Sequence, residues 1–196
     1  QQITATSASV TLNNAIDGSL GALSYATVGS SSDRVDSALN SLVTGNASPT
    51  AANDTADGTG GTTAAVEAGY NVTTVNASGA ATGVLANDSD SNSDTLSVAK
   101  VGTNSSTLQA VTAGTTSANG TQIVGKYGTL RMGANGSYSY TVDNTNPTVD
   151  ALQTGSFLTD VFAYSVSDGK GGSANATLTI RINGTNDAPV ANADYG

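Results

Sequence analysis

Hydrophobic and polar residues alternate in the C-terminal half of the chain, in short runs separated by turn-forming residues. Apolar side chains occupy every second position in residues 130–132, 138–142, 162–166 and 174–182. A period of two is typical of strands that bury one face. The glycine-containing segments 133–136 and 168–172 stand between consecutive runs, as turns do in β-hairpins. The pattern therefore predicts two successive hairpins.

Two further segments, residues 95–101 and 122–124, are rich in β-favouring residues and add strands to this set. Several short strands at this spacing predict an all-β sandwich. Aromatic residues make up only 5% of the chain, so we expect a core of thin aliphatic layers and tyrosines. The rings of four alternating residues are accordingly predicted to be core and rim residues rather than a platform for stacking sugars; they are Tyr138, Tyr140, Phe162 and Tyr164.

The first 48 residues follow a different pattern. Residues 2–12 alternate like a strand, but the phase slips once, as in a strand with a bulge. Residues 33–43 place apolar side chains on one helical stripe, between an N-cap at Ser32 and a stop at Gly45. We interpret residues 1–48 as an N-terminal extension with a strand arm and one helix. It is either the tail of a preceding domain or an extra strand and helix that pack on the sandwich.

Three carboxylates occupy one short loop, where Asp88, Asp90 and Asp94 alternate with serine and asparagine. Without a counterion these charges would repel one another. Ca²⁺ takes six to eight oxygen ligands in flexible geometry, so this set of oxygen donors suits it better than Mg²⁺ or a soft metal. The loop therefore predicts a calcium site.

The loop is not an EF-hand, although its first ligand positions match that motif. Ser93 stands where the EF-hand requires glycine, and Ala99 stands where it requires glutamate. Residues 84–85 and 95–98 on either side favour β-structure, and neither flank has helical periodicity. We therefore expect the acidic residues to lie in a loop between two strands.

The charge of the chain excludes several partners. It has 196 residues, a formal net charge of −9 and a pI near 4.1, which exclude nucleic acids and disfavour anionic membrane surfaces. No apolar run approaches the length of a membrane span. The chain contains no cysteine, which is compatible with a secreted protein stabilised by Ca²⁺ instead of disulfides. It begins at Gln1 rather than Met, as a fragment or a protein freed of its signal peptide would.

The residue inventory also argues against an enzyme. The chain has no histidine and no cysteine, and Glu67 is the only glutamate among its 15 acidic residues. The usual general bases and activated nucleophiles are therefore missing, and no two aspartates outside the acidic loop are marked as a catalytic pair. We predict a non-enzymatic protein.

An internal repeat indicates where the module begins and ends. Residues 49–54 and 189–194 share proline, alanine and aspartate at a constant offset of 140 positions (189 − 49). One complete unit would then span residues 49–188, and residues 189–196 would be a linker or the start of the next repeat.

Five segments together, in the right order, resemble the VCBS repeat, a bacterial cadherin-like module; they are residues 83–90, 133–140, 143–147, 164–172 and 184–191. The resemblance implies an immunoglobulin-like, Greek-key β-sandwich that binds Ca²⁺. It also implies a cell-surface or secreted location, as a repeat in large adhesins and matrix proteins.

The resemblance also implies a set of calcium ligands. Its calcium pattern falls on the aspartates of the acidic loop, with two further aspartates as partners and two residues of the C-terminal linker; the set is Asp88, Asp90, Asp94, Asp168, Asp54, Asn186 and Asp187. The linker residues resemble those with which cadherin-type domains bind Ca²⁺ between neighbours. At the other boundary Ala47 stands opposite Asp187, so the pattern departs there and no ion is expected before residue 49.

The leading interpretation is a calcium-stiffened extracellular module that links or polymerises in a surface fibre, adhesin or biofilm matrix. We expect self-association, as tandem repeats or as a head-to-tail homopolymer in which residues 1–12 add as a strand to a neighbour's sheet. The arm could instead fold back on its own domain. The alternative function is a ligand-binding adhesin domain that recognises glycans or a surface partner.

Overall fold

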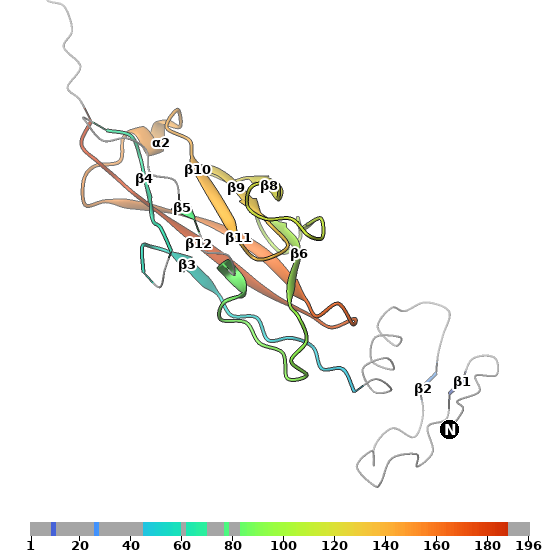
Figure 1. Ribbon diagram of the computed structural model, residues 1–196. Helices are drawn as coiled ribbons and strands as arrows, with labels where there is room; N and C mark the ends of the chain where they lie inside the picture. Colours follow the sequence, from blue (N-terminus) through green and yellow to red (C-terminus); the bar gives the residue numbers. More distant parts are fainter. Residues whose placement is uncertain are drawn as a thin grey trace, which may run out of the picture. The chain divides into compact units, whose positions relative to one another are not determined.

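A computed structural model of the chain is shown in Figure 1. It describes residues 45–59, 62–69 and 83–187, and the backbone of residues 9–10, 26–27 and 77–78. The chain divides into two compact units, residues 1–46 and residues 47–196, which are described separately.

The described residues of the first unit form one antiparallel pair, β1 (Ser9–Val10) with β2 (Ala26–Thr27). The predicted helix over residues 33–43 lies outside the described residues, as does most of the predicted arm over residues 2–12.

The second unit is a sandwich of two β-sheets. The four-stranded sheet is antiparallel and has the order β5 (Ala77–Ser78), β10 (Tyr138–Val142), β9 (Gly128–Met132) and β8 (Thr121–Val124). The larger sheet has the order β3 (Asp54–Ala56), β12 (Ser173–Asn183), β11 (Phe157–Ser167), β6 (Ser97–Gly102) and β7 (Gln109–Ala110). β4 (Ala65–Val66) also pairs with β12, and both β3 and β4 run parallel to it. The all-β prediction is confirmed (Figure 1).

Two short helical segments interrupt the strands, η1 (Gly83–Leu85) and α2 (Pro147–Asp150). The side chain of Asn146 caps α2 by accepting a hydrogen bond from the backbone N–H of Thr148 at 2.9 Å. Among the described residues, no helix is long and apolar enough to cross a membrane.

Both predicted hairpins are present. β9 and β10 pair across a tight turn, with Met132 opposite Tyr138 and Gly136 at a φ of 84°. β11 and β12 pair along their full lengths. Phe157 lies opposite Asn183 at one end, and Ser167 lies opposite Ser173 at the other end, next to the glycine-rich turn. The turns fall where the glycines stand because these positions need a left-handed backbone, which costs glycine little.

The core lies between the sheets and is built from alternate residues of the paired strands. Tyr138 is 2% exposed, and Tyr140, Phe162 and Tyr164 are fully buried, so the prediction that these rings are core residues is confirmed. Tyr140 and Phe162 meet edge to face, with centroids 6.0 Å apart. Aliphatic side chains such as Leu130 fill the rest of the layer, as expected for a chain with few aromatics.

The segment before the acidic loop differs from its prediction. Residues 84–85 were expected to be extended, but they belong to the 3-10 turn η1. Gly83 takes a φ of 40°, outside the extended region, and the N–H of Val84 donates to the carbonyl of Gly136 at 3.1 Å. The Val84 side chain is nevertheless fully buried. The hydrophobicity of Val84 therefore predicted its burial correctly, but the predicted backbone conformation was wrong.

The tyrosine hydroxyls of the core allow a matched test of buried polar groups. The Tyr140 hydroxyl donates to Asp160 Oδ2 at 2.9 Å, and the same buried oxygen accepts the N–H of Tyr127 at 3.0 Å. The Tyr138 hydroxyl is also buried, but it has no hydrogen-bond partner among the described residues.

We expect Tyr140→Phe to lower the free energy of unfolding by about 1–3 kcal/mol, because it removes a partner from a buried carboxylate. Tyr138→Phe should leave stability unchanged or raise it. Urea denaturation of both variants measures the difference, and equal losses would contradict the assignment.

Candidate metal centre

Strand pairing brings the acidic loop to the β11–β12 turn. β6 begins directly after the loop, and its first residue, Ser97, lies opposite Ser167, the last residue of β11. Residues just before Ser97 and just after Ser167 therefore meet at the same end of the sheet. This register places Asp90 and Asp94 beside Asp168, although the last lies more than seventy positions further along the chain.

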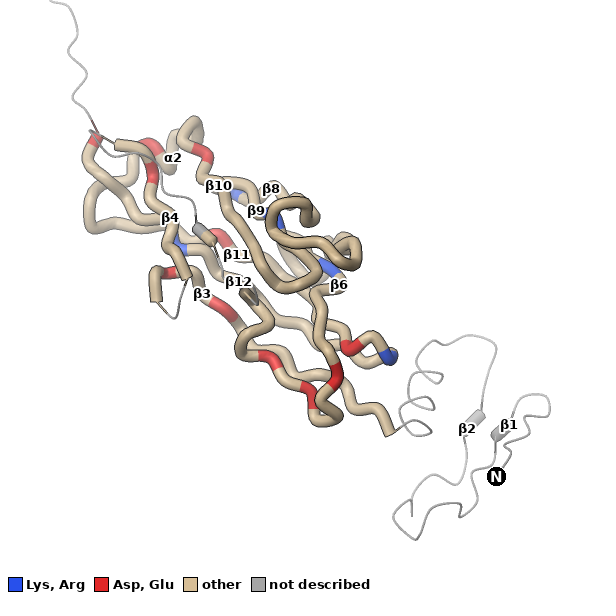
Figure 2. The backbone as a smooth tube through the Cα atoms, viewed as in Figure 1, with Lys and Arg blue, Asp and Glu red and all other residues tan. Residues whose placement is uncertain are grey.

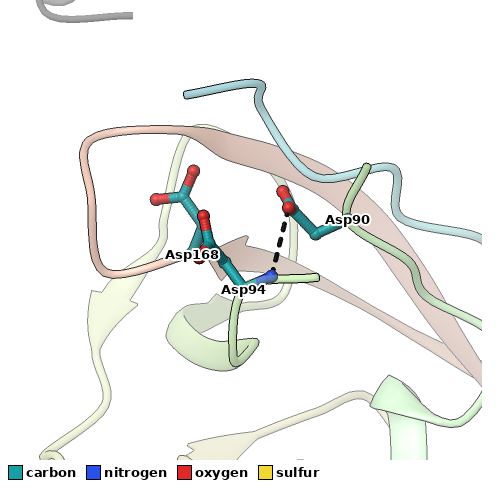
Figure 3. Close-up of side chains that lie close together, drawn as sticks. All are labelled: Asp90, Asp94 and Asp168. Atoms are coloured by element: carbon teal, nitrogen blue, oxygen red, sulfur yellow. Dashed lines mark hydrogen bonds between the residues drawn. The ribbon is translucent and has the colours of Figure 1, made fainter. Parts of the chain in front are cut away.

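These three aspartates form a compact cluster, which we call the acidic cluster. One carboxylate oxygen from each of Asp90, Asp94 and Asp168 lies within 4.8 Å of the other two. Figure 3 shows the side chains converging from the loop and the hairpin turn. Asp168 is 4% exposed, and the side chain of Asp94 is 9% exposed. Little water therefore reaches the carboxylates of Asp94 and Asp168, while Asp90 is partly buried.

The backbone around the cluster fixes one oxygen of Asp90 and one of Asp168. Asp90 Oδ1 accepts the N–H of Asn92 at 2.7 Å and that of Asp94 at 3.3 Å, the second of which is drawn in Figure 3. Asp168 Oδ1 accepts the N–H of Lys170 at 2.7 Å and that of Gly172 at 2.9 Å. Gly172 makes this approach feasible, because a Cβ at its position would clash with Asp168 Oδ2 and would also lie 2.8 Å from the Cα of Ser48.

Other oxygens of the cluster remain available. Asp90 Oδ2 and Asp94 Oδ2 are buried and have no hydrogen-bond partner among the described residues. A buried carboxylate oxygen without a partner is costly, and a bound cation would remove that cost. Converging carboxylates with free oxygens are the donor set of a hard cation, so the residues fit Ca²⁺.

One basic side chain already contacts the cluster. Lys170 Nζ lies 2.5 Å from Asp94 Oδ1, while the lysine side chain is 61% exposed. The hydrogen bond to Asp94 and the negative charges of Asp94, Asp168 and Asp90 raise the pKa of Lys170.

Two predicted ligands, Asp88 and Asp54, do not join the acidic cluster. Asp88 Oδ1 accepts the N–H of Ala52 at 2.8 Å, and Asp54 Oδ2 accepts the Tyr164 hydroxyl at 2.6 Å. Burial raises the pKa of Asp54 to about 6, and the charge of Asp88 adds to the rise. Burial also raises the pKa of Asp88. These two carboxylates thus form a second acidic pair that involves β3.

The predicted linker residues, Asn186 and Asp187, follow the other end of β12. The residue before them, Thr185, binds Glu67, an acidic residue that was not among the predicted ligands. Glu67 is fully buried, and its Oε1 accepts the N–H of Thr185 at 2.8 Å. Glu67 Oε2 and the Thr185 hydroxyl are buried without a partner among the described residues. Burial raises the pKa of Glu67, and the charges of Asp187 and Asp150 raise it further. One feature of the sequence could have identified Glu67 as a candidate ligand: it is the only glutamate in a chain rich in aspartate.

The two acidic regions lie at opposite ends of the larger sheet. β12 has 11 residues, which span about 36 Å, and it separates Asp168 from Asp187. The acidic cluster lies where the chain enters the domain, because Asn92 Oδ1 accepts the N–H of Ala47 at 2.5 Å. The region around Glu67 lies where the chain leaves it. Figure 2 shows acidic residues at both ends.

Comparison with known protein families identifies this sandwich. A family model described as the bacterial cadherin-like domain matches residues 46–184. A comparison with the sequences of curated proteins returned no match. The narrower resemblance to VCBS repeats stays a prediction. The family match covers both sheets and the acidic cluster, and well over half of the chain, so the chain belongs to the bacterial cadherin-like domain family.

Proposed function

We propose that this domain is a non-enzymatic structural module of an extracellular fibre, adhesin or biofilm matrix, and that calcium stiffens it. Membership in the cadherin-like family supports an extracellular adhesion or structural role in general. The observation that carries the more specific proposal is the acidic cluster, with its buried carboxylate oxygens that lack partners.

A cation in the acidic cluster would add a direct link between parts of the domain that lie far apart in the sequence. Asp90 and Asp94 belong to the loop before β6, whereas Asp168 belongs to the β11–β12 turn. The loop is in turn bound to the entry of the chain, since Thr50 and Ser89 exchange backbone hydrogen bonds at 2.7 and 3.0 Å. Ca²⁺ would therefore hold the loop, the hairpin turn and the entering chain together at one end of the sandwich.

We further propose a second Ca²⁺ position at the exit of the chain, with Glu67, Asn186 and Asp187 as ligands. The buried Glu67 Oε2 without a partner supports it, as does the charge of Asp187 nearby. A cation there would fix the direction in which the chain leaves β12. Cations at both ends would stiffen a row of such domains.

Self-association is the assembly we propose, by tandem repetition or by strand donation from residues 1–12. In support of strand donation, β6 pairs only with residues 163–167 of β11, so among the described residues the first half of β11 has no partner strand on that side. Phe157 and Val161 in this half are 50% and 45% exposed. An unpaired edge with exposed apolar side chains is suited to accept another strand.

The alternative of a glycan-binding domain has less support. A sugar-binding platform needs exposed aromatic rings, and the tyrosines whose burial is described, Tyr127, Tyr138, Tyr140 and Tyr164, are all at most 7% exposed. Phe157 is exposed, but the guanidinium of Arg181 lies over its ring, 4.0 Å from the centroid. We therefore retain the structural role as the proposal.

Electron microscopy of the purified chain, in calcium and in EDTA, tests the assembly. We expect filaments in calcium, and we expect them to disappear when residues 1–12 are deleted while the sandwich stays folded. A triple Ile3→Ser, Val10→Ser and Leu12→Ser variant should act like the deletion, because it removes the apolar side chains a neighbour would bury. A Thr4→Ser, Thr6→Ser and Thr11→Ser variant is the matched control and should still polymerise. A deletion variant that is unfolded would instead make the arm an internal strand of its own domain.

A further inference from the structure

The position of Lys170 places a positive charge inside the acidic cluster. Its backbone N–H is held by Asp168 Oδ1, so the residue is fixed at the cluster by the same turn that presents Asp168. Its ammonium group contacts Oδ1 of Asp94, and the other oxygen of that carboxylate, Oδ2, is one of the buried oxygens without a partner among the described residues. The side chain is 61% exposed, so its flexible stem can swing into solvent without disturbing the core.

We infer that Lys170 is a built-in competitor for the cation: its ammonium group occupies Asp94 in the calcium-free domain and must leave when Ca²⁺ binds. The inference rests on the proposed calcium site. It makes Lys170 a residue that sets the calcium concentration at which the domain stiffens.

The competition follows from charge and from the carboxylate of Asp94, which the lysine and the cation would share. Three carboxylates carry a charge of −3 when ionised, and the lysine compensates one unit of it in the absence of a metal. Ca²⁺ brings two positive charges and needs the carboxylate oxygens as ligands, so an ammonium group left beside it would be repelled. The ion pair is cheap to break because the lysine end is largely in water. Calcium therefore displaces the lysine, at a cost to its affinity.

The inference predicts effects of opposite sign in the two states of the domain. Without calcium, loss of the lysine charge leaves the carboxylates to repel one another, so the domain should melt at a lower temperature. With calcium, the same loss removes the competitor, so calcium should bind more tightly. If Lys170 had no role in the cluster, its substitution would change neither the melting temperature in EDTA nor the affinity for calcium.

The test uses Lys170→Met, which keeps the aliphatic stem and removes the charge without adding an oxygen ligand. Lys100→Met is the matched control, because it makes the same change in net charge at an exposed position on β6. Calorimetric titration with CaCl₂ measures the affinity, and Asp94→Asn identifies which binding event belongs to the acidic cluster. Thermal scans in EDTA measure the stability of the calcium-free state.

We expect Lys170→Met to bind calcium at the cluster about fivefold more tightly than the unmodified chain, and to melt at a lower temperature in EDTA. Lys100→Met should change neither value. A binding event that Asp94→Asn abolishes but Lys170→Met leaves unchanged or weakens would overturn the role of the lysine and leave the calcium site standing. Titrations with no binding event that depends on Asp94 would overturn both.

Discussion

Saturating calcium is expected to raise the melting temperature of the chain by roughly 5–10 °C over its value in EDTA. A ligand that binds only the folded state adds about 2.7 kcal/mol at a hundredfold excess over its Kd, and each kcal/mol shifts the melting temperature of a domain this size by about 2–4 °C. The unfolded chain cannot bring Asp168 to the acidic loop, so the site exists only after folding. Differential scanning calorimetry of metal-stripped protein, before and after addition of CaCl₂, measures the shift.

Isosteric variants assign this shift to the cluster. Asp94→Asn and Asp90→Asn should remove most of it, because a neutral amide oxygen attracts the ion much less strongly than a charged carboxylate does. Asp57→Asn is the matched control: Asp57 binds the N–H of Thr59 through Oδ1 outside the cluster, and asparagine can keep that bond. If Asp94→Asn responds to calcium as fully as the unmodified chain does, the ion lies elsewhere.

The fold followed from local patterns in the sequence because each hairpin is a local structure. Alternation defines which side chains face the core, and glycines define the turns, so both hairpins were predictable from contiguous residues. The parallel pairing of β3 and β4 with β12 was not, because those strands meet β12 more than a hundred positions away. Their two- and three-residue lengths also leave too little alternation to detect.

The sequence indicated the acidic character of the candidate site but only part of its membership. The density of aspartates in the loop indicated a hard cation, but the spacing of Asp88, Asp90 and Asp94 could not show which way each side chain points. Asp88 turns to the N–H of Ala52, a contact across 36 positions that no local pattern encodes. Glu67 was missed for the same reason, since its partner, Thr185, lies 118 positions away.

At the exit of the chain, Glu67→Gln is expected to stabilise the calcium-free domain and to abolish its response to calcium there. Burial and the charges of Asp187 and Asp150 disfavour the ionised carboxylate, which is why the pKa of Glu67 is raised. Glutamine keeps an oxygen for the N–H of Thr185 and carries no charge. In EDTA at pH 7 the variant should therefore unfold at a higher urea concentration than the unmodified chain.

The pH dependence of that difference follows from linkage. A carboxyl whose pKa is higher in the folded state binds its proton more tightly there, so the stability it contributes is fully present below its unfolded value, near 4.5, and is lost as pH rises through the folded value. The advantage of Glu67→Gln in EDTA should thus be small at pH 4 and largest at neutral pH. Urea unfolding across this range measures it.

Calcium should reverse the order of stability at neutral pH. The unmodified chain gains binding free energy at the exit, about 2.7 kcal/mol at a hundredfold excess over Kd, and Glu67→Gln does not. Asp187→Asn should likewise lose this gain. The calcium response of the acidic cluster, about 36 Å away along β12, should persist in both variants.

A Glu67→Gln variant that is less stable than the unmodified chain in EDTA would contradict the argument. The carboxylate would then be a favourable structural charge, and the buried Oε2 would have a partner other than a metal ion.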